Sequence, residues 1–245
     1  MCIRDRVLAG GLIAAILGPE VSRYSFDFFP NYIYLASYLF AAIIQIINFL
    51  ILIFINIKKP IPSKKINRPL GDVLLQKNLI IAILAAAVGY SLMSFIMTAT
   101  PLQIVNVCKL GDSASATVIQ WHVIAMFAPS FFTGTIINSL GNRKVMMIGL
   151  FLYAFSISFT IIGQTIEHFW IALFLCGLGW NFLYVGGSDI IAKSALPEER
   201  AKVQGVTDFI ILVFEFVTFL PSIFHFFIPP FNTETSFGSC PKKRN

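Results

Sequence analysis

Two long apolar segments meet at residues 131–145 across a turn so short that it fixes how they can be arranged. The turn carries two adjacent positive charges, Arg143 and Lys144, and an apolar run follows at once. Two apolar helices joined by a tight basic turn are typical of a membrane hairpin whose turn faces the cytoplasm. We expect Gly134 and Gly141 to let the backbones approach closely and the chain reverse sharply.

Composition argues against the alternative, in which these helices are buried in a large soluble domain. Of the 245 residues, 57% are hydrophobic and 12% are charged, whereas soluble domains carry about 25% charged residues. So few charges leave too little polar surface to solvate a globule of this size. The sequence therefore predicts an all-α integral membrane protein.

Apolar runs recur along the chain at lengths that fit a bilayer. A helix rises about 1.5 Å per residue, so about 20 apolar residues cross the hydrocarbon core. Residues 7–17 are too short for a full span and predict a partial helix that bends or ends at Gly18 and Pro19. Six further helices are predicted at residues 33–55, 79–100, 118–137, 145–162, 169–191 and 206–227.

Basic residues separate the two predicted sides of the membrane. Residues 58–77 form a hydrophilic linker with six Lys or Arg residues, one Asp and three prolines. If this linker is cytoplasmic, the inner loops hold eleven Lys and Arg residues and the outer loops hold two. Positive charge concentrates in cytoplasmic loops, so we expect a multi-pass membrane protein whose 58–77 linker is cytoplasmic. Nucleic-acid binding would need aromatic residues interleaved with the basic ones, and the linker has none.

Both ends of the chain depart from this plan. Residues 1–6, Met-Cys-Ile-Arg-Asp-Arg, resemble a translated sequencing adapter, and we expect them not to belong to the natural protein. A short natural N-terminus or a signal peptide is the alternative, but no small-x-small cleavage site follows. Residues 228–245 form a polar tail whose three basic residues would lie on the outer side, so the tail is either native or a frameshift product.

A few ionisable side chains lie within or beside the predicted helices. Such groups are costly in a membrane and are usually functional. Asp189 and Asp208 flank one charged turn, where either can pair with Arg200 or Lys202. We expect this pairing to lock the inner ends of two helices, and direct proton coupling is the alternative. Glu215 lies in the middle of the last predicted helix and is a candidate proton relay.

Polar or aromatic side chains within the apolar runs are candidates for a cavity wall. Gln45 and Asn48 are three residues apart and share one helix face. An imidazole at His122 is suited to sense or carry protons. For these amides and for the histidine, hydrogen bonds to neighbouring helices are the alternative. The full set of cavity candidates is Gln45, Asn48, Gln120, His122, Trp180 and Asn181.

Motifs for other chemistries are absent from the sequence. There is no GxxxxGK[ST] phosphate loop and no GxSxG nucleophile motif. The three histidines are scattered, and the cysteines form no Cys/His cluster. The sequence therefore predicts no catalytic residue, no metal and no cofactor, and it argues against an ATP-driven pump.

Four stretches carry a family resemblance. They are the Gly-Pro end of the first apolar run at residues 10–19, the basic linker at 58–77, the glycine-flanked basic turn at 134–144, and residues 180–208, which join the last two predicted helices. Residues 10–19 resemble the helix-five motif of antiporters, and residues 58–77 resemble the central cytoplasmic loop. Residues 134–144 resemble the loop between helices eight and nine, and residues 180–208 resemble helices ten and eleven. The family with these features is the major facilitator superfamily of bacterial permeases.

The resemblance implies a multi-helix transporter bundle, here covering about helices five to eleven as six full transmembrane helices and one partial helix. Residues 7–57 would end the N-terminal half with a partial helix five and helix six, and residues 78–227 would form helices seven to eleven of the C-terminal half. Asn138 stands where the loop motif has Asp, which weakens the charge relay of that motif. The residues assigned to the conformational loop are Gly134, Asn138, Gly141, Arg143 and Lys144.

The resemblance also implies a function. Members of this superfamily are secondary active transporters that move small solutes by alternating access, and the Gly18-Pro19 motif favours proton-coupled efflux. The partners would be a small solute, protons and the lipid bilayer, without nucleic acid, and the full-length protein would be a monomer. Because the matched helices form only part of the path, we expect the chain alone to be inactive. A non-transporting membrane scaffold and a membrane-embedded enzyme remain the alternatives.

Overall fold

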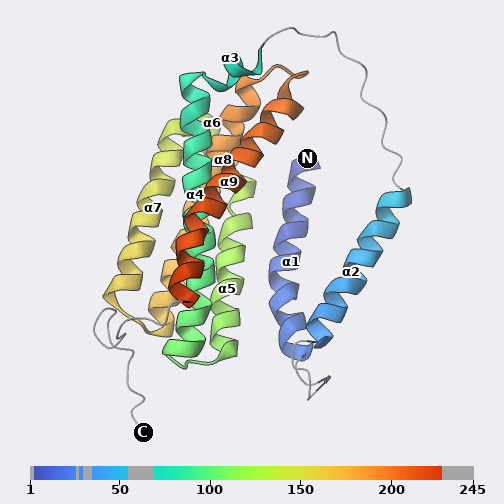
Figure 1. Cartoon of the computed structure of the whole chain (residues 1–245), viewed down its shortest axis with the longest axis vertical. Helices are drawn as coiled ribbons and strands as arrows, with labels where there is room; N and C mark the ends of the chain where they lie inside the picture. The colour runs from blue at the N-terminus through green and yellow to red at the C-terminus, as the bar shows by residue number, and fades with distance from the viewer. Residues whose placement is uncertain (1–2, 26–27, 30–34, 55–68, 228–245) are drawn as a thin grey trace.

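The computed structural model describes residues 3–25, 28–29, 35–54 and 69–227, and these form an all-helical bundle (Figure 1). The basic linker up to residue 68 and the tail after residue 227 lie outside the described residues. The helices in chain order are α1 (Ile3–Ser25), α2 (Leu35–Phe54), α3 (Leu70–Leu74), α4 (Lys77–Leu102), the π-helical turn η1 (Gln103–Val107), α5 (Asp112–Phe127), α6 (Ser130–Leu140), α7 (Asn142–Ile162), α8 (Ile166–Ser194) and α9 (Arg200–Phe227).

Several of these helices are long and apolar enough to cross a membrane. Within the described residues there are four such spans: α2, α4 together with η1, α7, and α8. The bent pair α5 and α6 makes a fifth if it is one span. The predicted all-α, multi-pass membrane class is confirmed, although α1 and α9 are not among the spans that meet these criteria.

Three prolines lie at places where the predicted and observed helices differ. At Gly18 and Pro19, where the sequence predicted a bend or an end, the helix does not end, because α1 continues to Ser25. The stop predicted before Pro101 is wrong, because α4 contains Pro101 and is followed directly by η1. A proline removes one backbone donor, and membrane helices tolerate it where local π-helical turns or neighbouring groups satisfy the freed carbonyls.

The fourth predicted helix is broken at a third proline. Residues 118–137 were expected to form one helix, but α5 and α6 meet at an angle of 43° across Ala128 and Pro129. The helix also starts earlier than expected, at Asp112. The break directs α6 away from the axis of α5.

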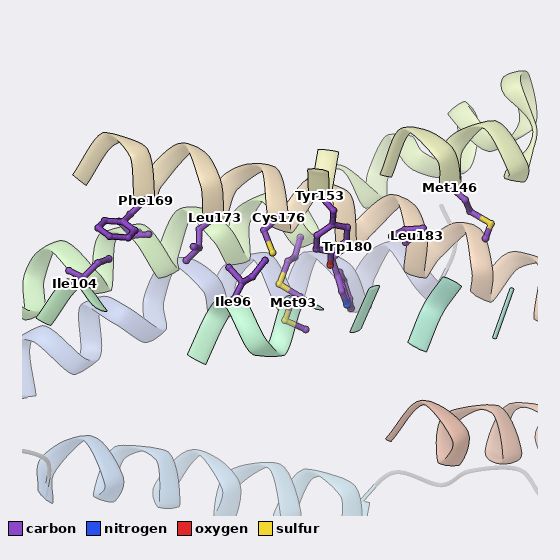
Figure 2. Packing of buried hydrophobic residues seen from close by; sticks show 12 residues of the cluster. Met93, Ile96, Ile104, Met146, Tyr153, Phe169, Leu173, Cys176, Trp180 and Leu183 are labelled. Carbon is purple, nitrogen blue, oxygen red and sulfur yellow. The ribbon is translucent and has the colours of Figure 1, made fainter. Parts of the chain in front are cut away.

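Helix α8 lies at the centre of the bundle and packs against α4, α5, α7 and α9. Its side chains from Phe169 to Leu183 contribute to the main apolar core, where Figure 2 shows Cys176 beside Met93 and Ile96 of α4 and Phe169 near Ile104. Tyr153 of α7 is buried in the same core. The core therefore joins helices that are far apart in the sequence.

Hydrogen bonds between helices supplement this apolar packing. The Tyr153 hydroxyl of α7 donates to the Gly89 carbonyl of α4 at 2.6 Å. The Ser156 hydroxyl of α7 donates to the Ala172 carbonyl of α8 at 2.7 Å. Both bonds are buried, and interhelical bonds of this kind hold membrane helices together because lipid is as apolar as the helices themselves.

Glycines bring the backbone of α8 into direct contact with its neighbours. A Cβ placed on Gly177 would lie 2.5 Å from the carbonyl oxygen of His122 on α5. A Cβ on Gly179 would lie 2.9 Å from the carbonyl oxygen of Gly149 on α7. A side chain at either glycine would therefore force the helices apart, and the small-residue surface sets the interhelical distance.

The two glycines of the central hairpin behave differently. Gly141 has φ of 83°, in the left-handed region that favours glycine, and it joins α6 directly to α7. The close approach predicted at Gly134 is wrong for this conformation, because a Cβ there would meet no atom within 4 Å. The sharp reversal of the chain therefore depends on Gly141.

The short helix α3, the α6–α7 turn and the α8–α9 turn lie at one end of the bundle (Figure 1). All three belong to the loops in which the sequence concentrates its Lys and Arg residues. The arrangement of the helices is therefore compatible with one basic side and one weakly charged side.

We expect Gly177→Val to lower the stability of the protein by about 1–3 kcal/mol, which is the usual cost of overpacking a tight contact. The added side chain would collide with the His122 carbonyl. The matched control is Gly205→Val, because Gly205 also lies within a helix but has open space around it. Thermal unfolding in detergent measures both, and equal effects of the two substitutions would contradict the packing argument.

Candidate functional site

Four aromatic side chains from three helices gather at the middle of α8. They are Tyr90 of α4, Phe127 of α5, and Trp180 and Tyr184 of α8, which we call the aromatic cluster. The Trp180 and Tyr184 rings are stacked, with centroids 4.7 Å apart and an angle of 9° between their planes. Tyr90 lies 6.2 Å from both rings, and Phe127 lies 6.5 Å from Trp180.

A cavity of about 290 Å³ lies beside the aromatic cluster. This volume is close to the lower end of the range for small-molecule sites, about 300–1,000 Å³. The indole nitrogen of Trp180 is buried, and within the described residues it has no hydrogen-bond partner. Its polar lining consists of Ser130, Ser188 and Asp189. The rest of its lining is mainly aromatic or aliphatic and consists of Phe127, Trp180, Tyr184, Val185 and Ala192.

Asn181 clamps the break between α5 and α6 from the neighbouring helix. Its side chain is fully buried and donates to the Met126 carbonyl at 2.6 Å and to the Ser130 hydroxyl. Its oxygen accepts a bond of 2.6 Å from the Thr133 hydroxyl. The break next to Pro129 frees backbone groups, and a polar side chain on an adjacent helix is one way to satisfy them in a membrane. Asn181 therefore holds Ser130 at the edge of the cavity.

Asp189 connects the cavity to the α6–α7 turn. Its carboxylate accepts from the Asn142 side chain at 2.8 Å and from Lys193 at 2.5 Å. The predicted pairing with Arg200 or Lys202 is wrong, because Lys193 lies one helical turn further along α8 and reaches the carboxylate first. Arg200 and Lys202 are both exposed at the start of α9.

The two carboxylates of α9 have neutral partners. Asp208 accepts from the Gln204 side chain at 2.8 Å, so its predicted pairing with Arg200 or Lys202 is also wrong. Glu215 accepts from the Ser94 hydroxyl of α4 at 2.6 Å. Within the described part of the chain, the ion pairs are Glu20 with Arg23 and Asp189 with Lys193.

The other cavity candidates lie elsewhere. His122 is buried, and its Nδ1 lies 2.7 Å from the Leu173 carbonyl of α8, which is the interhelical bond that the sequence left open as an alternative. Gln120 donates to the Ile16 carbonyl of α1 at 3.1 Å. Gln45 and Asn48 are exposed on α2 and do not line the cavity beside the aromatic cluster.

The loop candidates lie at the end of the bundle and not in the cavity. Asn138, Arg143 and Lys144 are exposed. The loop residue that reaches the site is Asn142, whose side chain also donates to the Gly186 carbonyl at 3.0 Å. Within the described residues, no group of three or more His, Cys, Asp or Glu side chains is placed to hold a metal ion.

Sequence reasoning missed several residues that the fold brings to the site. Tyr90 and Ser94 are four residues apart on α4 and share one face, a pattern that could have drawn attention to both. Thr133 gave no such signal, because its bond to Asn181 depends on the break between α5 and α6.

Comparison with known proteins identifies the family. The model of the Major Facilitator Superfamily matches residues 6–211. The chain belongs to the major facilitator superfamily. The three curated relatives described next carry transporter names.

Three curated relatives give the extent of the similarity. The riboflavin transporter RfnT of Brucella anthropi is 39% identical over 208 residues, which is 83% of this chain and 52% of that protein. The uncharacterized MFS-type transporter YdeG of Bacillus subtilis is 35% identical over 141 residues, which is 56% of this chain and 32% of that protein. The uncharacterized MFS-type transporter YddS of the same organism is 30% identical over 135 residues, which is 54% of this chain and 31% of that protein. The matched part of the chain thus spans about half the length of RfnT and about a third of the length of YdeG and of YddS. No solved structure matches it.

We expect Asn181→Leu to destabilise the protein, because the Met126 carbonyl and the Ser130 and Thr133 hydroxyls would lose buried partners. Leaving a buried polar group unsatisfied costs about 1–3 kcal/mol. The control is Asn138→Leu, since Asn138 is exposed on α6. Unfolding followed by tryptophan fluorescence compares the two, and an Asn181 variant as stable as the control would show that the clamp is dispensable.

Proposed function

We propose that this chain is part of a secondary active transporter that moves a small solute across the bacterial inner membrane by proton-coupled alternating access. The superfamily match and the transporter names of three relatives support this proposal. In it, α1 and α2 end one half of the permease, residues 58–77 cross between the halves in the cytoplasm, and α4 to α9 belong to the other half. The helix-five motif at Gly18 and Pro19 favours export as the direction.

For the substrate we propose a planar aromatic molecule, with riboflavin as the first candidate. The observation that carries this choice is the stacked pair Trp180 and Tyr184 beside a cavity. Flat rings stack favourably on aromatic side chains, at about 0.5–1.5 kcal/mol for each pair beyond simple burial. The riboflavin transporter RfnT, with 39% identity, supports the same substrate class.

The polar groups of the cavity suit the rest of such a molecule. The buried indole N–H of Trp180 has no acceptor within the described residues, and a ring carbonyl of the solute would supply one. The hydroxyls of Ser130 and Ser188 and the carboxylate of Asp189 would bind hydroxyl groups on a flexible side chain of the solute.

The hydrogen bond from Asn142 to Asp189 connects this site to the conformational loop. A solute that bonds to Asp189 competes with the Asn142 amide, which belongs to the turn between α6 and α7. In this proposal the loop residues Gly134, Asn138, Gly141, Arg143 and Lys144 reposition when the inner end opens or closes.

The experiment is riboflavin exchange in proteoliposomes that contain the complete product of the gene encoding this chain. We expect exchange in the wild type and an affinity at least tenfold lower in Trp180→Ala and Tyr184→Ala, since tenfold corresponds to about 1.4 kcal/mol. The control is Trp121→Ala, because Trp121 is 41% exposed and pairs with Trp170 outside the cavity.

Two outcomes would contradict the proposal. Normal riboflavin affinity in both cavity variants would remove the aromatic cluster from the binding site. An absence of riboflavin exchange in the wild type would overturn the substrate assignment, and an absence of flux for any solute would favour a membrane scaffold.

A further inference from the structure

One side chain of the solute cavity rests on a helix that does not line the cavity. Phe127 of α5 lines the cavity and lies beside Trp180, and its ring also meets Gly11 of α1. A Cβ built on Gly11 would lie 3.1, 3.2 and 3.4 Å from three carbon atoms of that ring. Carbon atoms pack best at about 3.5–4.0 Å, so a side chain at Gly11 would press on the Phe127 ring.

Polar contacts further along α1 hold this helix against α5. The Gln120 amide of α5 donates to the Ile16 carbonyl of α1 at 3.1 Å. Nearer the end of α1, the Arg23 guanidinium donates to the Thr117 hydroxyl of α5 at 2.6 Å. Because these bonds fix the two backbones relative to one another, a new side chain at the glycine contact would displace the Phe127 ring and not the helix.

The Phe127 ring cannot move without changing the cavity. It lies edge-to-face with Trp180, with centroids 6.5 Å apart and an angle of 61° between the planes. Trp180 is in turn stacked on Tyr184. The cavity beside these rings has a volume of only about 290 Å³. A small displacement of Phe127 therefore alters the space that is left for a planar solute.

We propose that Gly11 is a positioning residue that sets the size of the ring system the solute cavity accepts. This inference rests on the proposed function, in which α1 and α5 belong to different halves of the transporter. Gly11 presents no side chain to Phe127, so that ring stands back far enough for a three-ring planar solute. One half thus sets the width of a cavity whose lining comes from α5, α6 and α8 of the other half.

The first test measures the affinity of the complete transporter for riboflavin and for ribityllumazine, which carries the same side chain on a two-ring system. We expect Gly11→Val to weaken riboflavin binding by about tenfold or more and ribityllumazine binding much less, because the smaller ring system needs less room. Gly11→Ala should act in the same direction with a smaller effect. The matched control is Gly10→Val, since a Cβ on Gly10 would meet no described atom within 4 Å.

A double-mutant cycle separates positioning from a general packing defect. Phe127→Ala removes the ring on which the new side chain would press. In that background, Gly11→Val should change riboflavin affinity by less than about twofold, whereas Gly10→Val should show no coupling to position 127. An equal loss of both solutes in Gly11→Val, or additive effects of Gly11→Val and Phe127→Ala, would overturn the inference.

A second measurement needs no solute. Since Phe127 lies beside Trp180, Gly11→Val should shift the fluorescence emission of a protein that keeps Trp180 as its single tryptophan, and Gly10→Val should not. An unchanged emission in Gly11→Val would mean that the ring has not moved, and it would overturn the inference. If the emission shifts but the wild type binds no riboflavin, the substrate assignment fails and Gly11 still positions Phe127.

Discussion

Backbone contact between α8 and its neighbours is the constraint on which the rest of the structure depends. Gly177 and Gly179 leave no room for a side chain against α5 and α7. Because lipid competes with protein for apolar surface, membrane helices associate through close packing and interhelical hydrogen bonds. The glycine surface allows both, and it places the side chains of α8 in direct contact with helices on several sides.

The functional geometry follows from that central position. Residues 180 and 181 are neighbours on α8 but do different things: Trp180 stacks on Tyr184 beside the cavity, and Asn181 clamps the break between α5 and α6. A shift of α8 would therefore move the ring that we assign to the solute and the clamp that positions Ser130 together. This coupling of packing and site is what a transporter that changes conformation as rigid helical units needs.

The sequence predicted the class of structure because hydropathy and charge act over whole segments. Runs of about 20 apolar residues and the basic turn at Arg143 and Lys144 are strong signals, and they give the helices and the family resemblance. Proline misled at Pro101, because a residue that ends helices in water is tolerated within membrane helices, as it also is at Pro19.

Side-chain partners were harder to predict than helices. Asp189 bonds to Asn142 and Lys193 and not across the turn to α9, since the choice depends on distances of a few ångströms that spacing in the sequence does not give. Trp180 was a candidate for a cavity wall from its sequence context, and it does line a cavity. Its partner Tyr90 is ninety residues away in the sequence, and only the packing of α4 on α8 brings the two rings together.

The most direct test of the account is quenching of Trp180 fluorescence by riboflavin in a protein that keeps Trp180 as its single tryptophan. Within this chain that requires replacing Trp121 and Trp170 by Phe, since the chain has three tryptophans. The account predicts saturable quenching that non-fluorescent planar analogues of riboflavin reverse by competition. Quenching that rises linearly with riboflavin and is not reversed by competitors would mean collisional contact without a site, and it would contradict the account.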